Sequence, residues 1–523
     1  MSPTVYLLIV IGYILVMLGV GYWCMRRTKT VGDFFLGGRS LGPWMSAFAY
    51  GTTYFSAVLF IGYAGKLGWG FGLYTMWIVV GNTLVGTLLA WKILAGRTRA
   101  MTTRLNAMTM PEFLRARYGS TPLQVIAALV VFAFLVPYSA SVLMGLSYLF
   151  EMTLHISYDS ALYFLTALTA VYLVMGGYFA VAVSDFIRGI IEFGGVLLMV
   201  YLLAHHPKIG GFLPAMDKLL SDPTSAPALA AVKTLGKGTW LAVAAPGWLT
   251  LSALVAITSF GPWALPQMVQ KFYSIRRQAD VTRAMTIAGI FALFMAFGAY
   301  FSGALTHLFY GPKLPPELIS GTGPIWDKIM PHFITTAGLP EVLVMIVVLM
   351  VFSASMSSLS SLVLVSSSAM AIDIYGAFVN RQANQRQTMI LLRVLCAVFV
   401  GASLWIALKR PSFIVNLMIM SWGTLLGVFF APYLYGLFWR RTTSAGVYAG
   451  IAAGLTSAWL LFPGWGPDGV PLAAAVTMLL PLLVVPLVSM MTRPPESALI
   501  AQAFGDGQNQ ASAAEPTEVA SHR

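Results

Sequence analysis

The stretch AYGTTYFSAVLFIGYAG, residues 49–65, is apolar enough to cross a membrane, yet Gly51, Thr52 and Thr53 lie early in it. A glycine followed by two β-branched residues weakens a helix at that point. The stretch TSFGPWALPQ, residues 258–267, has the same character, because its two prolines each remove a backbone donor. Interrupted helices at corresponding positions of two halves indicate a transporter built from inverted repeats.

The rest of the chain is equally apolar. Hydrophobic residues make up 58%, charged residues 9%, and the mean hydropathy is +0.80, whereas soluble domains carry about 25% charged residues. Soluble enzymes, nucleic-acid-binding proteins and disulfide scaffolds are therefore excluded. We expect thirteen spans, each long enough for about 30 Å of hydrocarbon, at roughly 5–24, 44–65, 71–93, 122–151, 158–180, 184–205, 239–270, 281–310, 339–376, 389–408, 412–439, 443–463 and 470–491.

The two interrupted spans are the second and the seventh, five spans apart. This spacing predicts an all-α polytopic membrane protein with two five-helix repeats, about 44–205 and 239–439. One extra helix precedes the repeats and two follow them. We expect residues 1–493 to form a single transmembrane domain. Residues 494–523 are rich in Ala, Gln, Ser and Glu, and they predict a disordered cytoplasmic tail.

Basic residues predict the orientation, because cytoplasmic loops accumulate Lys and Arg. The bias places the N-terminus outside and the C-terminus inside an inner (plasma) membrane, and it explains the net charge of +13 without a nucleic-acid partner. The basic residues that fall on the expected inner side are Arg26, Arg27, Lys29, Arg39, Arg97, Arg99, Arg104, Arg115, Arg117, Lys271, Arg276, Arg277, Arg381, Arg386, Arg440, Arg441 and Arg493.

The ninth span carries a serine cluster in FSASMSSLSSLVLVSSSAM, residues 352–370. Ser357, Ser360 and Ser361 are spaced i, i+3 and i+4, so they share one helix face, and Ser358 lies beside them. Serines in a span also pack helices together. Their number here favours a hard monovalent cation, which neutral oxygens can bind without burying a full countercharge.

Asp185 is an ionisable residue within the expected sixth span, with Arg188 and Glu192 three and seven positions later. Such a residue at membrane depth is by default a candidate functional group. A structural ion pair with Arg188 near the cytoplasmic interface is equally compatible with the spacing. The sequence has no nucleophile–base motif and no metal-ligand spacing of histidines, so we expect neither an enzyme nor a transition-metal centre.

Four segments resemble one family. DFFLGGRSLGPW (residues 33–44), SAVLFIG (56–62), AVYLVMGGYFAVAVSD (170–185) and ASMSSLSSLVLVSSSAMAIDIYGAF (354–378) are similar to motifs of the sodium:solute symporters, above all their proline and pantothenate branches. The similarity runs from about residue 5 to 445. It implies the leucine-transporter-like fold with an extra N-terminal helix, and sodium-driven import of a small organic solute (amino acid, carboxylate or vitamin-like) by alternating access.

The resemblance also implies cation sites for one or two sodium ions. The main sodium site would use Thr52, Phe55, Ala354, Ser357 and Ser358. A second sodium site, which some members have, would use Asp185, Ser357, Ser360 and Ser361. Two alternatives stay open at this point, a proton-coupled transporter that uses Asp185 and a transport-inactive membrane sensor with the same fold.

For the solute, the resemblance and the broken spans give a mostly apolar pocket with an aromatic lid. The candidate residues are Ser56, Leu59, Tyr138, Phe260 and Trp263. Leu59 replaces a glutamine of the sugar-transporting branch, and residues 138–141 lack the arginine of members that bind acidic sugars. Tyr138 matches a pocket tyrosine of the proline branch, whereas Thr258 stands where that branch has an aromatic residue.

Overall fold

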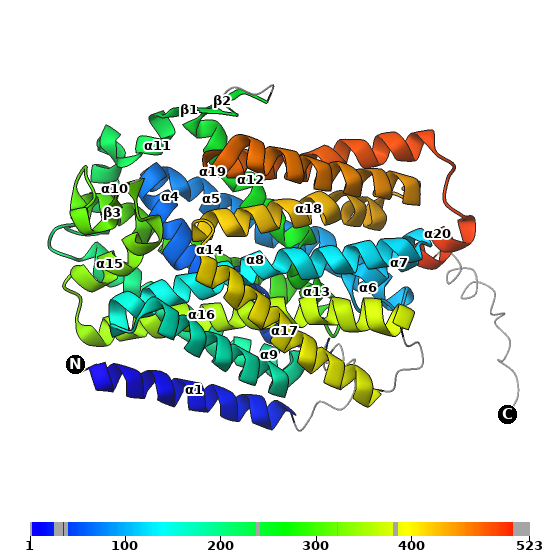
Figure 1. Cartoon of the computed structure of the whole chain (residues 1–523), viewed down its shortest axis with the longest axis horizontal. Helices are drawn as coiled ribbons and strands as arrows, with labels where there is room; N and C mark the ends of the chain where they lie inside the picture. The colour runs from blue at the N-terminus through cyan, green and yellow to red at the C-terminus, as the bar shows by residue number, and fades with distance from the viewer. Residues whose placement is uncertain are drawn as a thin grey trace, which may run out of the picture.

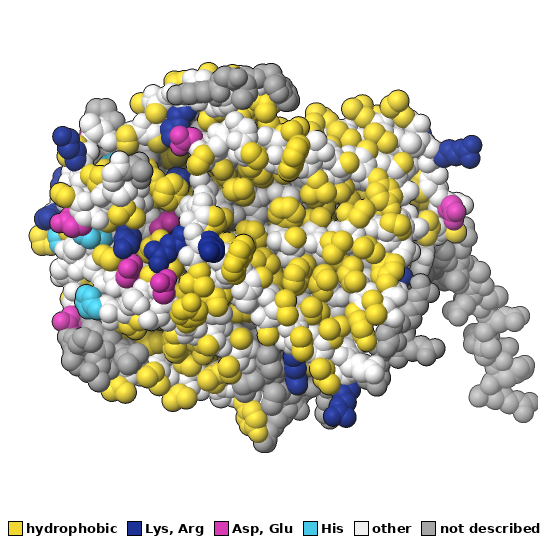
Figure 2. All heavy atoms as spheres, in the orientation of Figure 1, with side chains coloured by type: hydrophobic (Ala, Val, Ile, Leu, Met, Phe, Trp, Pro, Cys, Tyr) yellow, Lys and Arg dark blue, Asp and Glu magenta, His cyan; other side chains and the backbone are white. Residues whose placement is uncertain are grey.

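The computed structural model describes residues 3–25, 35, 40–236, 241–321, 323–379 and 385–505. Long helices run side by side along one axis of the molecule (Figure 1). Figure 2 shows hydrophobic side chains spread over the middle of one face, while charged side chains and histidines gather toward one end of it. This distribution matches a molecule whose middle faces lipid.

Eight elements form most of the bundle. They are α1 (Pro3–Met25), α8 (Thr121–Leu154), α9 (Tyr158–Ala204), α14 (Asp280–Tyr310), α16 (Glu341–Ser368), α17 (Gln385–Lys409), α18 (Ile414–Phe438) and α19 (Ser444–Met491). Helix α16 continues as the π-helical segment η9 (Ala369–Val379), and α1 packs against α9.

The second expected span is interrupted, as predicted. Helix α3 (Pro43–Tyr54) ends before Phe55, whose φ of −110° and ψ of 127° are extended, and the chain resumes as η2 (Val58–Tyr63) and α4 (Ala64–Phe71). Gly51 lies inside α3, where a Cβ would come within 2.4 Å of the Phe291 ring. The break therefore falls four residues after Gly51. Gly51 itself allows the close approach of α14.

After α4 the chain turns sharply at Gly72, whose φ is +50°. The next span is a continuous helical run that changes its winding along its length. It comprises η3 (Gly72–Thr75), α5 (Met76–Val80), η4 (Gly81–Leu89), η5 (Trp91–Ala95) and α6 (Gly96–Arg104).

The seventh expected span is also broken. Helix α12 (Gly247–Ala264) and helix α13 (Pro266–Tyr273) meet at Leu265 with a bend of 41°. Pro262 is accommodated within α12, so Pro266, which begins α13, marks the interruption. A Cβ on Gly261 would lie 2.5 Å from the Trp422 ring, and this glycine allows α18 to approach.

Helices α4 and α14 touch through their backbones. A Cβ on Gly68 would lie 2.4 Å from the carbonyl carbon of Gly303, and a Cβ on Gly303 would lie 2.1 Å from the carbonyl oxygen of Ala64. No side chain larger than hydrogen fits at either position without separating the two helices.

The count of thirteen spans stays a prediction. Within the described residues, eight helices are long and apolar enough to cross a membrane, or nine with the bent α12–α13 pair. Residues Val58–Arg104 form one such unit, α9 runs across the expected boundary near residue 182, and α19 contains a kink at Gly466 with φ 65°.

Short elements cover the two ends of the bundle (Figure 1). One end carries the α1 N-terminus and most of these elements, and the other carries α6, α7 (Met110–Tyr118) and α20 (Ser497–Phe504). The elements near the first end are α10 (Phe212–Ser221), η6 (Pro223–Ser225), α11 (Pro227–Ala230), β1 (Val232–Leu235), β2 (Val243–Pro246), η7 (Pro316–Leu318), β3 (Ile319–Ser320), β4 (Gly323–Pro324), η8 (Trp326–Lys328) and α15 (Ile329–Thr336).

Helix α20 differs from the expected disorder after residue 494. Arg104 of α6 donates a hydrogen bond to the Ala503 carbonyl at 2.8 Å, and the Arg117 guanidinium lies 5.3 Å from the Phe504 ring. These contacts attach α20 to the bundle. The composition of the segment alone does not reveal this short helix. Residues 506–523 of the predicted tail lie outside the described residues, as do Arg26, Arg27, Lys29, Arg39 and Arg381.

Candidate ion and solute sites

The break after α3 gathers backbone oxygens around one serine hydroxyl. Ser358 Oγ of α16 lies 3.3 Å from the Thr52 carbonyl oxygen, 3.1 Å from that of Thr53 and 3.5 Å from that of Phe55. These separations exceed the usual 2.7–2.8 Å of an O–H···O hydrogen bond. Several oxygens at such distances can share a cation.

Local structure explains why these carbonyls are available. Because α3 stops at Tyr54 and Phe55 is extended, the carbonyls of its last turn lose the amide donors of a continuing helix. The partial negative charge of the α3 C-terminus adds to their attraction for a cation. The Thr52 hydroxyl instead donates to the Phe48 carbonyl at 2.9 Å, so Thr52 offers its backbone oxygen.

The other residues of the expected main sodium site lie on α16, the helix that carries Ser358. Ala354, Ser357 and Ser358 are fully buried and spaced i, i+3 and i+4. Among the residues that the structure describes, none makes a hydrogen bond to Ser357 Oγ. The structure thus brings Ser358 together with Thr52 and Phe55, and Ala354 and Ser357 lie on the same helix as Ser358.

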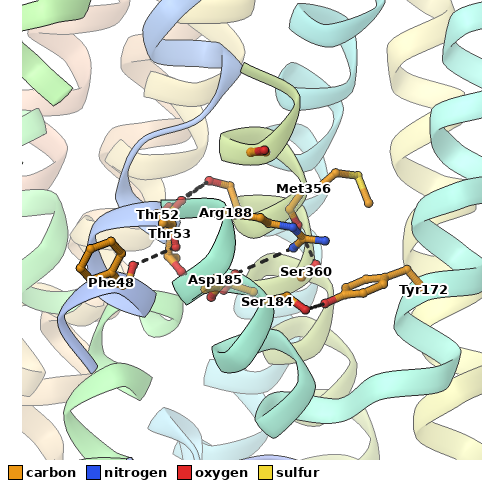
Figure 3. Close-up of polar contacts among 12 residues, drawn as sticks. Phe48, Thr52, Thr53, Tyr172, Ser184, Asp185, Arg188, Met356 and Ser360 are labelled. Carbon is orange, nitrogen blue, oxygen red and sulfur yellow. Dashed lines mark hydrogen bonds and ion pairs between the residues drawn. The ribbon is translucent and has the colours of Figure 1, made fainter. Parts of the chain in front are cut away.

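The second expected group, here called the Asp185 cluster, consists of Asp185, Ser357, Ser360 and Ser361. Figure 3 shows Asp185 and Arg188 of α9 between α3, which carries Thr52 and Thr53, and α16, which carries Ser360. Asp185 is fully buried, and neither of its carboxylate oxygens has a hydrogen-bond partner in the described part of the chain.

The other two serines of the Asp185 cluster already have partners. Ser360 Oγ donates to the Met356 carbonyl at 2.6 Å. Ser361 Oγ lies 2.9 Å from Thr53 Oγ1 and 3.0 Å from Lys271 Nζ. Lys271 was expected among the basic residues of an inner loop, but α13 carries its side chain into the bundle, where it is fully buried.

Arg188 lies beside Asp185 without a close ion pair. Its Nη1 is 3.9 Å from Asp185 Oδ1, and its guanidinium lies 4.8 Å from the Tyr172 ring centroid. Glu192, one turn further along α9, is equally buried. These residues form a group of ionisable side chains inside the bundle. Their positive and negative charges must offset one another, because an isolated buried charge is costly.

A small cavity opens beside the break of α3, with a volume of about 20 Å³. Of the expected solute residues, Ser56 and Leu59 line it, and Tyr138 packs edge-on against the lining residue Trp422 with ring centroids 5.7 Å apart. The other lining residues are Tyr54, Phe55, Val58, Tyr63, Asn82, Thr258, Tyr300 and Met418.

Phe260 and Trp263 lie away from this solute cavity. Phe260 faces a separate apolar groove between α5, η4 and α12. The Trp263 indole donates to the Val85 carbonyl at 2.9 Å, which directs the ring toward η4 and Phe430. Their facing could not be predicted from the sequence, because it depends on how α12 packs against η4 and α18.

Three polar atoms that line the solute cavity lack partners within the described residues. They are the Tyr63 hydroxyl, Asn82 Oδ1 and Trp422 Nε1, all buried. No charged side chain lines the cavity in the part of the chain that the structure describes. Buried polar atoms are normally satisfied, so two donors and one acceptor remain for a small polar guest.

Two broken helices, a carbonyl cluster beside a serine helix and a small central cavity define a cation-coupled secondary transporter. The model of the sodium:solute symporter family matches residues 34–454. The chain belongs to this family and couples the import of a small solute to sodium.

Relatives of known activity extend along most of the chain. The osmoregulated proline transporter OpuE of Bacillus subtilis is 26% identical over 503 residues, which cover 93% of this chain and 94% of that protein. The high-affinity proline transporter PutP of the same organism is 28% identical and is covered to 99%. The sodium/proline symporter of Escherichia coli is 28% identical over 87% of both chains.

A solved structure confirms the leucine-transporter-like fold. A sodium-coupled sialic acid symporter in an outward-open, substrate-bound state superposes with a TM-score of 0.74 at 18% identity. The alignment covers 94% of this chain and 98% of that one.

Proposed function

We propose that the protein imports a small neutral or zwitterionic amino acid of about the size of proline, driven by sodium at the main site, and that it acts as a transporter and not as an enzyme. The observation that supports this most directly is the convergence of Ser358 Oγ on three carbonyl oxygens at the break of α3. A cation bound there would lie next to the solute cavity, because Phe55 lies in both.

The cavity supports the choice of solute. At about 20 Å³ the cavity has room for little more than a water molecule in this conformation, so a small solute requires the least widening. Without a lining lysine or arginine among the described residues, a carboxylate would be bound by the Trp422 indole, the Tyr63 hydroxyl and the Ser56 region. The names of the relatives, which transport proline, point to the same class of solute.

Two observations support the proposed orientation in an inner membrane, with the N-terminus outside. The α1 N-terminus and helix α20 lie at opposite ends of the bundle (Figure 1). Arg104 and Arg117 lie at the α20 end, in agreement with the cytoplasmic enrichment of basic residues.

The proposal is tested by uptake of labelled proline into proteoliposomes under an inward sodium gradient, an inward proton gradient or no gradient. Unlabelled amino acids, monocarboxylates, vitamins and nucleobases serve as competitors. We expect uptake only with sodium, and competition mainly from small neutral amino acids. Empty liposomes provide the background.

Uptake driven by protons alone would replace sodium coupling with the proton-coupled alternative. Competition by a vitamin or nucleobase in place of amino acids would overturn the solute. Sodium-independent binding without any transport would instead support the sensor alternative.

A further inference from the structure

Lys271 carries an ammonium group into the centre of the bundle. It lies on α13, the second half of the broken α12–α13 span, and its side chain is fully buried. Nζ donates to Ser361 Oγ at 3.0 Å and lies 4.9 Å from the Tyr178 ring centroid. The ammonium therefore lies against one of the serines that the resemblance assigns to a second sodium ion.

The charge of Lys271 acts on the carboxylate of the same cluster. The positive charge of Lys271 favours the charged form of Asp185, although its hydrogen bond goes to Ser361. Asp185 is likewise the charged partner of Lys271. A buried ammonium needs such a partner, since its desolvation is costly.

Two buried basic side chains already lie among the buried acidic ones. Arg188 and Lys271 face the carboxyl groups of Asp185 and Glu192, so the described residues supply as many basic groups as acidic ones. A sodium ion added to the Asp185 cluster would leave one uncompensated positive charge in a low-dielectric interior, which is strongly unfavourable.

From this arrangement we infer that the Lys271 ammonium is a tethered cation that takes the place of a second sodium ion in the Asp185 cluster. The main site then remains the only sodium site, and one ion accompanies each solute molecule. This inference rests on the proposed function, because it requires that the main site bind sodium. It also assigns a role to α13, whose position at the break brings the ammonium to Ser361.

The number of bound sodium ions tests this inference directly. Equilibrium binding of ²²Na⁺ to the purified full-length protein gives the number per molecule. We expect one ion for the wild type. Lys271→Met removes the tethered charge and leaves the buried groups one positive charge short, so this variant should bind two ions.

Two matched variants separate charge from packing. Lys271→Arg keeps a positive charge in a long side chain and should bind one ion. The double variant Lys271→Met/Asp185→Asn removes both charges, restores the balance and should also bind one. Size-exclusion profiles and the sodium affinity of the main site serve as controls for folding.

Two sodium ions bound to the wild type would overturn the inference while leaving the proposed sodium coupling intact. A well-folded Lys271→Met variant that binds one ion would overturn it as well. No sodium bound to the wild type would contradict the main site, and with it the proposed function. The wild-type count needs no substitution, so the inference stays testable even where a variant fails to fold.

Discussion

At the scale of single residues, Ser358 is the side chain on which the main sodium site depends. Ser358→Ala removes one hydroxyl ligand and creates almost no cavity. The loss of such an interaction costs about 1–2 kcal/mol, so sodium affinity should fall about 5- to 30-fold. Titration of ²²Na⁺ binding measures this change.

Ser403→Ala provides the matched control. Ser403 is also buried, and its hydroxyl donates to the Phe399 carbonyl of its own helix at 2.9 Å, within α17. We expect its sodium affinity to match that of the wild type. Equal losses in both variants would mean that the decrease comes from general destabilisation, against a role of Ser358 as a ligand.

Trp422 is expected to bind the solute through its unpartnered indole. Trp422→Phe keeps the ring contact with Tyr138 but removes the N–H donor. One hydrogen bond contributes about 0.5–1.5 kcal/mol, so solute affinity should fall about 2- to 13-fold while sodium affinity is retained. Competition binding with the transported solute measures the solute affinity, and ²²Na⁺ binding measures the sodium affinity.

Trp405→Phe is the control for Trp422→Phe. The Trp405 side chain is 64% exposed on α17, so its substitution should change neither the solute nor the sodium affinity. A decrease of sodium affinity in Trp422→Phe equal to that of solute affinity would place Trp422 in a structural role.

The sequence predicts residues that belong to one continuous motif better than residues brought in by packing. The serine spacing of α16 and the weak helix at Thr52 are both local signals, and the structure brings these two segments together. Lys271, Asn82 and Trp422 come from other elements. Which side of those elements points into the bundle depends on tertiary packing. Nothing near Lys271 in the sequence distinguishes it from a basic loop residue, because its burial results from where α13 begins.

At the scale of elements, helix α7 depends on Thr109 for two connections. Thr109 Oγ1 accepts a hydrogen bond from the Glu112 amide at 3.1 Å, in a capping box, and donates to Asp373 Oδ1 of η9 at 2.8 Å. Thr109→Ala removes both. The lost cap alone costs about 1 kcal/mol, and Asp373 loses a buried donor, so the melting temperature should fall by several degrees.

Thr286→Ala is a suitable control for this thermal measurement. Thr286 is exposed on α14, and its hydroxyl donates to the Thr282 carbonyl of its own helix. Its melting temperature should stay within about one degree of the wild type, as for most surface substitutions. A Thr109→Ala variant as stable as this control would contradict the double role of Thr109.

The positions of the helix breaks show where prediction from sequence ends. Both interrupted spans are identifiable from glycine and proline, but the break after α3 lies at Phe55 and Ser56, beyond Gly51. Gly51 and Gly261 instead admit the rings of Phe291 and Trp422. A sequence shows that a glycine is present, whereas the ring that approaches it belongs to another helix.

At the scale of the whole molecule, Asp327 connects the segment between α14 and α16 to the start of α18. Its carboxylate oxygens accept from the Ile414 amide at 3.2 and 3.4 Å. Burial raises the pKa of Asp327 to about 7, while the Ile414 amide and Lys66 oppose this rise. The folded protein therefore holds a proton here that the unfolded chain releases near pH 4.

The sign of the pH effect follows from proton linkage. Between about pH 4 and 7 the folded state binds more protons than the unfolded state at this position, so its contribution to stability decreases as pH rises through that range. We expect the melting temperature of the wild type to be higher at pH 5.5 than at pH 7.5. Asp327→Asn should reduce this difference, and Asp217→Asn, at an exposed side chain of α10, should not. The same pH dependence in all three proteins would contradict the assignment.

The fold class of the whole molecule was predictable because hydropathy reports on the membrane directly. The two repeats follow from the spacing of two broken spans. Helix α20 was not predictable, since its eight residues depend on contacts with Arg104 and Arg117, about 400 residues away in the chain.

The backbone contact between Gly68 and Gly303 has a mechanical consequence. Since the backbones of α4 and α14 meet at Gly68 and Gly303, we expect these two helices to move together. A rotation of α3 relative to these two helices would then change the backbone conformation of the extended segment at Phe55 and Ser56. The Phe55 carbonyl belongs both to this extended segment and to the expected sodium ligands. A sodium ion bound there would restrain the segment, and its release would let the segment move.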